Sequence, residues 1–277
     1  MGKHRPTRPP GPRQVPRLAL SPRVIGTLVA LTLVAGATDV WMQRRARQAS
    51  GAVSPARAAT APETRTAVAP PVQEQPVSLV AESTVPLVRV HGSPEGKLTH
   101  RLAHPTENGV PLVFLVQRQD DGWLKVYLPV RPNGSTGWIR ERDVELTQHS
   151  YRIVVRLKDH RLLAFEGGGE QGRLILAADV GVGTANTPTP GGTYYIKELL
   201  RPRDPNSVYG KYAYGLSGFS NVLQTFRGGP GVIGIHGTND PSSIGRDVSA
   251  GCIRMRNRDI AKLVKILPLG TPVEIQE

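Results

Sequence analysis

Turn-forming residues divide much of this chain into short apolar runs, and few of the runs reach the length of a helix. Thirty of the 277 residues are glycine, and only four are phenylalanine. Short runs rich in β-branched residues, separated by Gly, Pro, Asn and Asp, are typical of strands joined by tight turns. The sequence therefore predicts a mainly β chain and not a helical bundle.

The first 47 residues differ in composition from the rest. They carry nine Lys and Arg residues against one Asp, so they hold most of the formal net charge of +13. We expect a basic disordered tail over 1–23. The apolar run over 24–41 is expected to be a transmembrane anchor, or a signal segment cleaved near Ala35-Gly-Ala37. Because the arginines precede a membrane-directed segment, we expect a membrane partner and no nucleic-acid partner.

Both interpretations of this segment predict that the rest of the chain is exported from the cytoplasm. The first predicts a membrane-anchored protein with its C-terminal part outside the cytoplasm, and the alternative is a secreted protein. Residues 48–76 contain eight Ala and five Pro and show no apolar periodicity. This composition predicts a linker, whether it acts as a tether of defined reach or as a plain connector.

Residues 77–147 contain short apolar runs separated by turn formers, a pattern that predicts a small β-barrel. The segment 122–140, which holds Trp123 and Trp138, resembles the end of bacterial Src-homology-3-like domains. That resemblance implies binding of cell wall or peptide. The alternative is that both tryptophans are core residues of a spacer module, since buried aromatic side chains serve packing first.

Residues 150–277 are predicted to form a second, mainly β domain with one clear helix. The helix is expected to begin near Asn257, which is a suitable N-cap, and to bury the face that carries Ile260 and Leu263. The expected strands are 151–157 and 161–165 as a hairpin, then 175–183, 192–196, 232–236 and 273–275.

The single cysteine, Cys252, follows a glycine and lies sixteen residues after His236, at the end of an expected strand. One cysteine cannot form an internal disulfide or a cysteine-rich zinc site. A thiol needs a base to become a good nucleophile at neutral pH, and an imidazole in hydrogen-bond reach can serve. We therefore expect a metal-free and cofactor-free Cys252/His236 pair. The alternative is a buried, inert cysteine.

Residues around the thiol are candidates for binding the substrate. The backbone N–H groups of Gly251 and Cys252 are candidates for an oxyanion site, because the glycine lets a carbonyl approach the backbone. The guanidinium group of Arg254 offers a planar set of donors for a substrate carboxylate or carbonyl. Its alternative role is that of a solvated charge at a strand edge.

The run from His236 through Ser-Ala-Gly-Cys-Ile-Arg-Met at 249–255 resembles the catalytic signature of YkuD-type L,D-transpeptidases. The segment 187–191 resembles the Thr-Pro-x-Gly element that precedes it in this family. The resemblance covers residues 150–277 and implies a β-sandwich-like catalytic domain. Carried over by position, it makes Cys252 the nucleophile and His236 the base. It also places Ser249, Gly251, Arg254 and Gly237 around the substrate. Many members have His where this chain has Ala250.

The resemblance implies acyl transfer on peptidoglycan stem peptides through a thioester, giving 3→3 cross-links or attaching a wall protein. Acylation of Cys252 by carbapenems is also implied. A hydrolase or carboxypeptidase with the same residue pair is one alternative, and a non-catalytic wall-binding protein is another. Residues 204–215 contain three tyrosines, which are expected either to cover a bound stem peptide or to be core and surface aromatics.

Overall fold

The computed structural model describes residues 77–167 and 169–277, which lie within one compact unit of the chain. The tail predicted over 1–23, the anchor or signal segment over 24–41 and the linker over 48–76 lie outside the described residues. Within the described ranges, no helix is long and apolar enough to cross a membrane.

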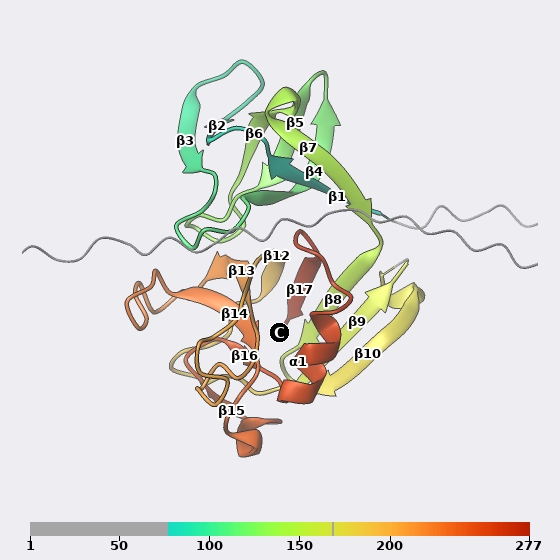
Figure 1. The fold of residues 1–277 in the computed structure, drawn as a ribbon, viewed down its shortest axis with the longest axis vertical. Coiled ribbons are helices and arrows are strands. Elements are labelled where there is room, and N and C mark those ends of the chain that lie inside the picture. The colour runs from blue at the N-terminus through green and yellow to red at the C-terminus, as the bar shows by residue number, and fades with distance from the viewer. Residues whose placement is uncertain (1–76, 168) are drawn as a thin grey trace, which may run out of the picture. The chain divides into compact units, whose positions relative to one another are not determined.

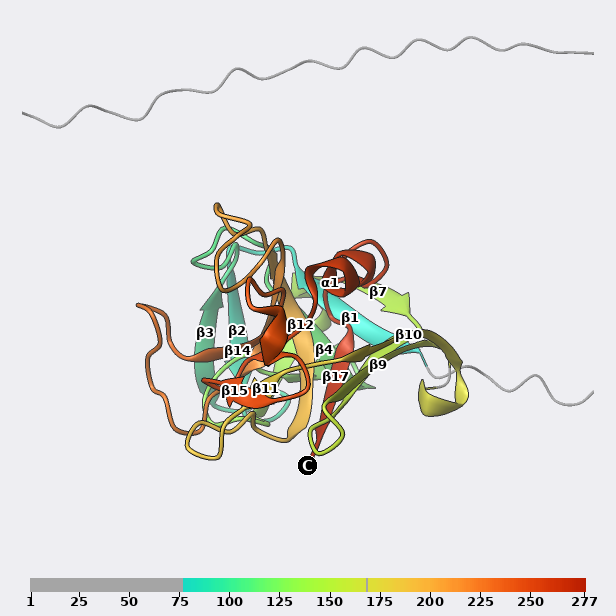
Figure 2. The ribbon, with the colours of Figure 1, turned by 90° about the horizontal axis from the view of Figure 1, so that it is seen from below.

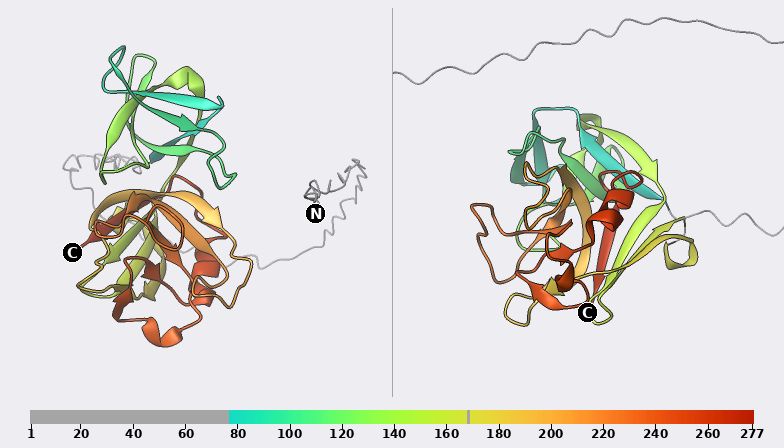
Figure 3. Two further views of the ribbon diagram at one scale, coloured as in Figure 1. Left: turned by 90° about the vertical axis from the view of Figure 1, so that its left-hand side faces the viewer. Right: turned by 60° about the horizontal axis from the view of Figure 1, so that its bottom comes forward.

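Residues 78–149 form one antiparallel sheet of seven strands, in the order β3-β2-β6-β5-β4-β1-β7 (Figure 3). The strands are β1 (Ser78–Ser83), β2 (Leu87–His91), β3 (Leu98–Ala103), β4 (Val113–Asp120), β5 (Trp123–Tyr127), β6 (Thr136–Arg140) and β7 (Val144–His149). Trp123 and Trp138 are both buried, so packing accounts for both indole rings. The Src-homology-3-like character of this region stays a prediction.

The C-terminal residues form a mixed sheet of eight strands, in the order β10-β9-β8-β17-β12-β13-β14-β16, and a separate parallel pair, β11-β15. The strands are β8 (Tyr151–Arg156), β9 (Arg161–Glu166), β10 (Arg173–Asp179), β11 (Val182–Gly183), β12 (Gly192–Leu200), β13 (Ala213–Phe219), β14 (Val232–His236), β15 (Asp247–Ser249), β16 (Ile253–Arg254) and β17 (Pro272–Gln276). Figure 2 shows β11 and β15 side by side.

The long strand β12 joins the two halves of the eight-stranded sheet. Its first residues pair with β17, and its last residues pair with β13, which follows it in the sheet order. In Figure 1, β8, β9 and β10 lie on one side of β17 and α1, and β13, β14 and β16 lie on the other. The predicted sandwich-like domain is thus built on one eight-stranded sheet, whose two halves are joined by β12, with the pair β11-β15 beside it.

The predicted helix is α1 (Asn257–Leu263), and its face with Ile260 and Leu263 is fully buried in the main core. The expected cap is wrong, because the N-cap position is Arg256 and no side chain caps the helix. Asn257 instead bonds to Thr238, donating to its carbonyl at 3.0 Å and accepting from its N–H at 3.2 Å. Its amide therefore joins the helix to the loop after β14.

Two strand predictions need correction. The run 175–183 forms two elements, β10 and β11, because the chain changes partners after Asp179: β10 pairs with β9, and β11 pairs with β15. Strand β13 was not expected, since its glycines weaken a strand pattern. A Cβ atom at Gly218 would lie 2.3 Å from the ring of Tyr194, and one at Gly215 would lie 2.4 Å from Glu198 Oε1. Close packing by neighbouring side chains therefore requires glycine at both positions.

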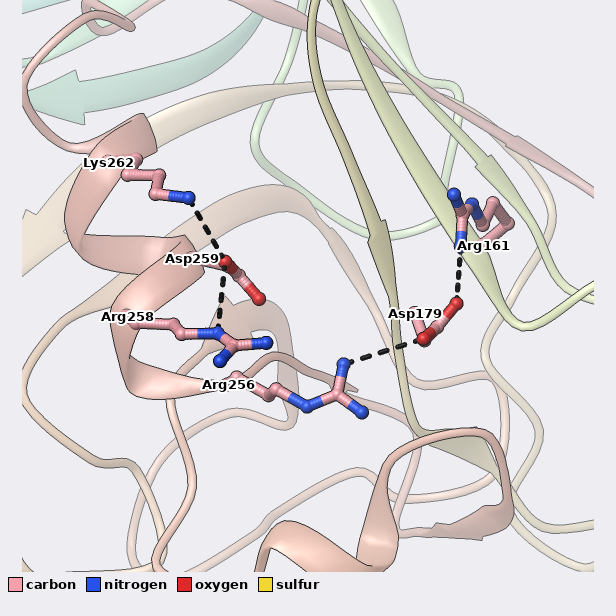
Figure 4. A network of polar contacts seen from close by, with 6 residues as sticks. All are labelled: Arg161, Asp179, Arg256, Arg258, Asp259 and Lys262. Atoms are coloured by element: carbon pink, nitrogen blue, oxygen red, sulfur yellow. Dashed lines mark hydrogen bonds and ion pairs between the residues drawn. The ribbon is translucent and has the colours of Figure 1, made fainter.

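Asp179 connects the β9–β10 hairpin to the segment before α1 (Figure 4). Its carboxylate accepts a hydrogen bond from Arg161 at 2.5 Å and another from Arg256 at 3.4 Å. The bond from Arg161 contributes most to holding the pKa of Asp179 below its ordinary value. On α1 itself, Asp259 lies 3.7 Å from both Arg258 and Lys262. The Arg256–Asp179 contact therefore links the start of the helix to the hairpin, whereas the contacts of Asp259 lie within the helix.

The loop between β5 and β6 holds the loop between β13 and β14. The guanidinium group of Arg131 donates to the carbonyls of Ser220, Leu223 and Pro230 at 2.7, 3.0 and 3.1 Å. Asn133 exchanges two hydrogen bonds with the backbone of Phe219, at 2.7 and 2.8 Å. One side chain that satisfies three carbonyls fixes the shape of the loop over 220–231.

Replacing Arg131 with alanine is expected to lower the free energy of unfolding by about 1.5–3 kcal/mol, the range for hydrogen bonds to a charged group. Urea denaturation measures this change. Arg142→Ala is the matched control, since its side chain is 79% exposed and its carboxylate partner is 3.9 Å away, so it should cost under about 1 kcal/mol. Equal losses for the two variants would contradict the prediction.

Candidate active site

Cys252 and His236 line the same groove, which has a volume of about 540 Å³. His236 is the last residue of β14, and β14 pairs in parallel with β16, which begins directly after Cys252. The loop between them contains the 3-10 turn η3 (Pro241–Ser243), where the Asp240 carboxylate accepts from the Ser242 N–H. The predicted return of the chain therefore brings the two residues to one groove.

The imidazole of His236 is held in one orientation. Its Nδ1 lies 2.6 Å from the carbonyl oxygen of Gly237, so Nδ1 donates and Nε2 is left as the acceptor. The ring of Tyr209 packs against it edge to face, with centroids 5.0 Å apart. Burial lowers the pKa of His236 to about 4, and the positive charge of Arg254 contributes in the same direction. The imidazole is therefore neutral at neutral pH.

The thiol of Cys252 is also neutral at rest. Burial raises its pKa above the ordinary value, although a backbone hydrogen bond from Gly234 and the charge of Arg254 act in the opposite direction. The sulfur lies 4.0 Å from the carbonyl oxygen of Val232. A neutral thiol and a neutral imidazole that line one groove favour general-base catalysis, in which the proton leaves as the new sulfur–carbon bond forms.

Ser249 stabilises the turn that presents the thiol. Its hydroxyl donates to the carbonyl of Cys252 at 2.6 Å and accepts from the N–H of Gly251 at 3.1 Å. Thr187, in the upstream element, donates to the Ser249 carbonyl at 3.0 Å. The φ of Gly251 is +113°, a conformation that favours glycine. Ser249 thus acts on the cysteine backbone.

The expected oxyanion site needs a correction, because the Gly251 N–H is already bonded to Ser249. The N–H of Cys252 has no hydrogen-bond partner among the described residues. Of the two amides predicted, only that of Cys252 remains available to a substrate oxygen.

Replacing Ser249 with alanine is expected to leave the buried Gly251 N–H unpaired, which costs about 1–3 kcal/mol of folding free energy. The same change should slow acylation of Cys252, because the turn that holds the thiol loosens. Thermal unfolding and the acylation rate measure the two effects. Ser242→Ala, at an exposed hydroxyl away from the thiol, is the control, and a S249A variant that matches it in both assays would refute the assigned role.

Gly237 contributes through its backbone and is not among the residues that line the groove. Its carbonyl orients His236, and its N–H donates to the carbonyl of Tyr212 at 3.1 Å. A Cβ atom there would lie 2.0 Å from Oδ1 of Asn257. The glycine is therefore needed for close packing behind the histidine.

Arg254 lines a smaller cavity of about 70 Å³ that also contacts Cys252, His236, Ser249 and Ala250. Its guanidinium group makes no ion pair with any residue in the part of the chain that the structure describes. An unpaired cation beside the thiol suits a substrate carboxylate.

Two of the three tyrosines of 204–215, Tyr209 and Tyr214, line the groove. Tyr214 is also 1% exposed and belongs to the core, against which Tyr212 packs. Covering of a bound stem peptide by Tyr209 stays a prediction. The 220–231 loop adds Phe226 and Arg227 to the groove wall, and β12 adds Glu198. These three residues were not found from the sequence, because their distance from the motif gives no signal.

Within residues 77–167 and 169–277, no group of three His, Cys, Asp or Glu side chains is arranged to hold a metal ion.

A family model described as the L,D-transpeptidase catalytic domain, YkuD, matches residues 150–275. These residues form a YkuD-type domain. The match contains Cys252, His236 and the other groove residues named above. Asn108, in the loop between β3 and β4, also lines the groove and lies outside the match. The resemblance inferred from the motif is therefore confirmed for this part of the chain, and the region over 77–147 lies outside the match.

Two curated relatives of the YkuD-type domain come from Bacillus. YkuD of Bacillus licheniformis, named as an L,D-transpeptidase, is 41% identical over 125 residues, which cover 45% of this chain and 65% of the relative. YkuD of Bacillus subtilis is 42% identical over 103 residues, which cover 37% of this chain and 54% of the relative. The chain thus spans between half and two thirds of the length of these relatives.

Solved structures of L,D-transpeptidases resemble the chain more distantly. L,D-transpeptidase 3 from Mycobacterium tuberculosis, in complex with a faropenem-derived adduct, is 18% identical with a TM-score of 0.40, and the match covers 72% of this chain and 91% of that chain.

Proposed function

We propose that the YkuD-type domain transfers an acyl group from a peptidoglycan stem peptide through a thioester on Cys252. The observation that carries the proposal is the shared groove of Cys252 and His236, with the imidazole held so that Nε2 can accept a proton. The family match over 150–275 supports it, since that family is described as an L,D-transpeptidase catalytic domain.

In the first step, the sulfur of Cys252 attacks the carbonyl carbon of the diamino acid at stem position three. The thiol proton passes to Nε2 of His236, and the negative charge develops on the carbonyl oxygen near the N–H of Cys252. When the tetrahedral intermediate collapses, the carbon–nitrogen bond to the terminal D-Ala breaks. His236 then returns the proton to the leaving amine, so that the thioester and free D-Ala remain.

In the second step, an amine attacks the thioester and His236 accepts its proton, while the Cys252 sulfur leaves and is reprotonated. An amine on a neighbouring stem gives a 3→3 cross-link, and an amine on a wall protein gives attachment. If water attacks instead, the product is a free carboxylate and the enzyme is a carboxypeptidase. Tyr209 and Phe226 line the groove, and the extent to which they exclude water from the thiol decides between the amine and water.

The test is product analysis after incubation of the purified full chain with a tetrapeptide donor, with and without an acceptor amine. We expect D-Ala release, an adduct that maps to Cys252, and a cross-linked product when acceptor is present. Carbapenems are expected to form the same adduct bond. A tripeptide acid as the only product would identify the hydrolase. No adduct under reducing conditions would favour the non-catalytic, wall-binding alternative.

For the rest of the chain, we propose that the apolar segment 24–41 exports the domain, as an anchor in the cell membrane or as a cleaved signal. The proposal rests on the sequence pattern alone. The middle sheet is proposed to be a Src-homology-3-like module, supported by its antiparallel strands and tight turns.

A further inference from the structure

A buried carboxylate lies in the groove of the proposed active site. Glu198, on β12, is 5% exposed, and it is the only acidic residue among the described residues that line the groove with Cys252. A buried carboxylate costs folding free energy unless it is paired. This one has two protein partners, and its place in the groove leaves it accessible to a bound ligand as well.

Glu198 lies in register with two glycines that lead to the thiol. It pairs with Gly215 on β13, and Gly215 pairs with Gly234 on β14. Residues that are directly opposite in a sheet project from the same face. Because both intervening residues lack a side chain, the groove floor between Glu198 and Cys252 is open.

The carboxylate lies over the next strand of the floor, on the side of Glu198 where β13 and β14 follow. A Cβ atom at Gly215 would lie 2.4 Å from Glu198 Oε1, so the carboxylate lies over the neighbouring strand. Gly234 is one strand further, roughly 5 Å away, and its backbone forms the hydrogen bond that acts on the pKa of Cys252. The carboxylate is therefore roughly 5–10 Å from the sulfur.

Two protein groups already contact the carboxylate. Asn108 donates from Nδ2 to Oε2 at 2.6 Å, and the ammonium group of Lys197 lies 3.6 Å from Oε1. Lys197 does not line the groove, so it contacts the carboxylate from outside the floor. A carboxylate has about four acceptor positions. Glu198 therefore keeps acceptor capacity beyond these two contacts.

We propose that Glu198 binds the side-chain ammonium group of the donor residue whose carbonyl Cys252 attacks. This inference rests on the proposed function, which places a diamino acid at that position. A four-carbon side chain carries its nitrogen roughly 6–7 Å from the carbonyl carbon, which matches the separation along the glycine floor. Glu198 thus selects donors with an amine in the third side chain and fixes the scissile carbonyl at the sulfur.

The experiment compares two tetrapeptide donors, identical except that one has its third side-chain amine acetylated. Acylation of Cys252 in the full-length chain is followed by intact mass and D-Ala release, with no acceptor amine present. The wild-type protein should acylate about 10- to 100-fold faster with the free amine, the range expected for a charge-assisted hydrogen bond. Glu198→Gln should remove this preference, so that the ratio of the two acylation rates falls to about one.

Glutamine keeps a side-chain oxygen that can accept the hydrogen bond from Asn108. The variant therefore removes the negative charge that would bind the donor ammonium group and keeps the size of the side chain. Glu145→Gln, which removes a carboxylate from the surface of β7, is the matched control and should behave as wild type. If E198Q keeps the preference, or slows both donors equally, the assignment is wrong. If E198Q slows only the later transfer to an added amine, the carboxylate serves the acceptor, which also overturns it. Wild-type protein that forms no adduct with either donor would refute the proposed function, and the assignment with it.

Discussion

Replacing Cys252 with alanine is expected to abolish acyl transfer, with D-Ala release falling by a factor of about 10⁴ or more. The groove contains no second thiol, since the chain has one cysteine, so the variant has no nucleophile for the first step. The measurements are D-Ala release from a tetrapeptide and the intact mass of the protein after incubation with donor or carbapenem. No adduct should form on the variant.

Two controls separate loss of the nucleophile from loss of the fold. Thermal unfolding of C252A should stay close to that of wild type, because only one sulfur atom is removed from a half-buried side chain. Binding to isolated peptidoglycan should also be kept, since the groove and Arg254 remain. Transfer activity that persists in C252A would show that the thiol is not the nucleophile.

The sequence was sufficient to predict the Cys252/His236 pair, because strand β14 and the Ser-Ala-Gly-Cys motif are local patterns. The same holds for the hairpin of β8 and β9 and for the buried face of α1, which follow from alternation and helical periodicity. In each case the signal comes from a short stretch of sequence, such as the strand that ends at His236 or the motif around Cys252. Partners far away in the sequence were not needed to find it.

The features that escaped prediction depend on partners far away in the sequence. Gly215 lies in a strand although glycine weakens a strand pattern. The position is glycine because Glu198 occupies the space where a side chain would be. Asn257 resembles a cap, but the backbone of Thr238 takes its amide. The sequence gives no sign that Glu198 lines the groove, because its position there depends on the pairing of β12 with β13. Such assignments follow from tertiary contacts, which local propensity does not encode.

Replacing His236 with glutamine is expected to slow acylation of Cys252 by about 10²–10⁴-fold, the usual contribution of a general base. In the wild-type protein the imidazole has a pKa of about 4, so it stays neutral and able to accept a proton well below pH 6. The acylation rate should therefore fall on the acid side near pH 4, and the variant should lack that limb. A rate that falls instead near the ordinary histidine value of 6.5 would contradict the buried, neutral imidazole.

The same shift makes His236 a source of pH-dependent stability. Its pKa is about 4 in the folded protein and has the ordinary histidine value of 6.5 in the unfolded chain, so the unfolded chain binds the proton more readily between these values. The stabilising contribution is complete above pH 6.5 and is lost as the pH falls to about 4, which amounts to about 3 kcal/mol.

Urea denaturation at pH 7 and at pH 4 measures the loss, and H236Q corrects for every other titrating group. Because glutamine has no proton to gain, the wild-type protein should lose about 3 kcal/mol more than the variant. Equal losses would mean that solvent reaches the imidazole in the native state.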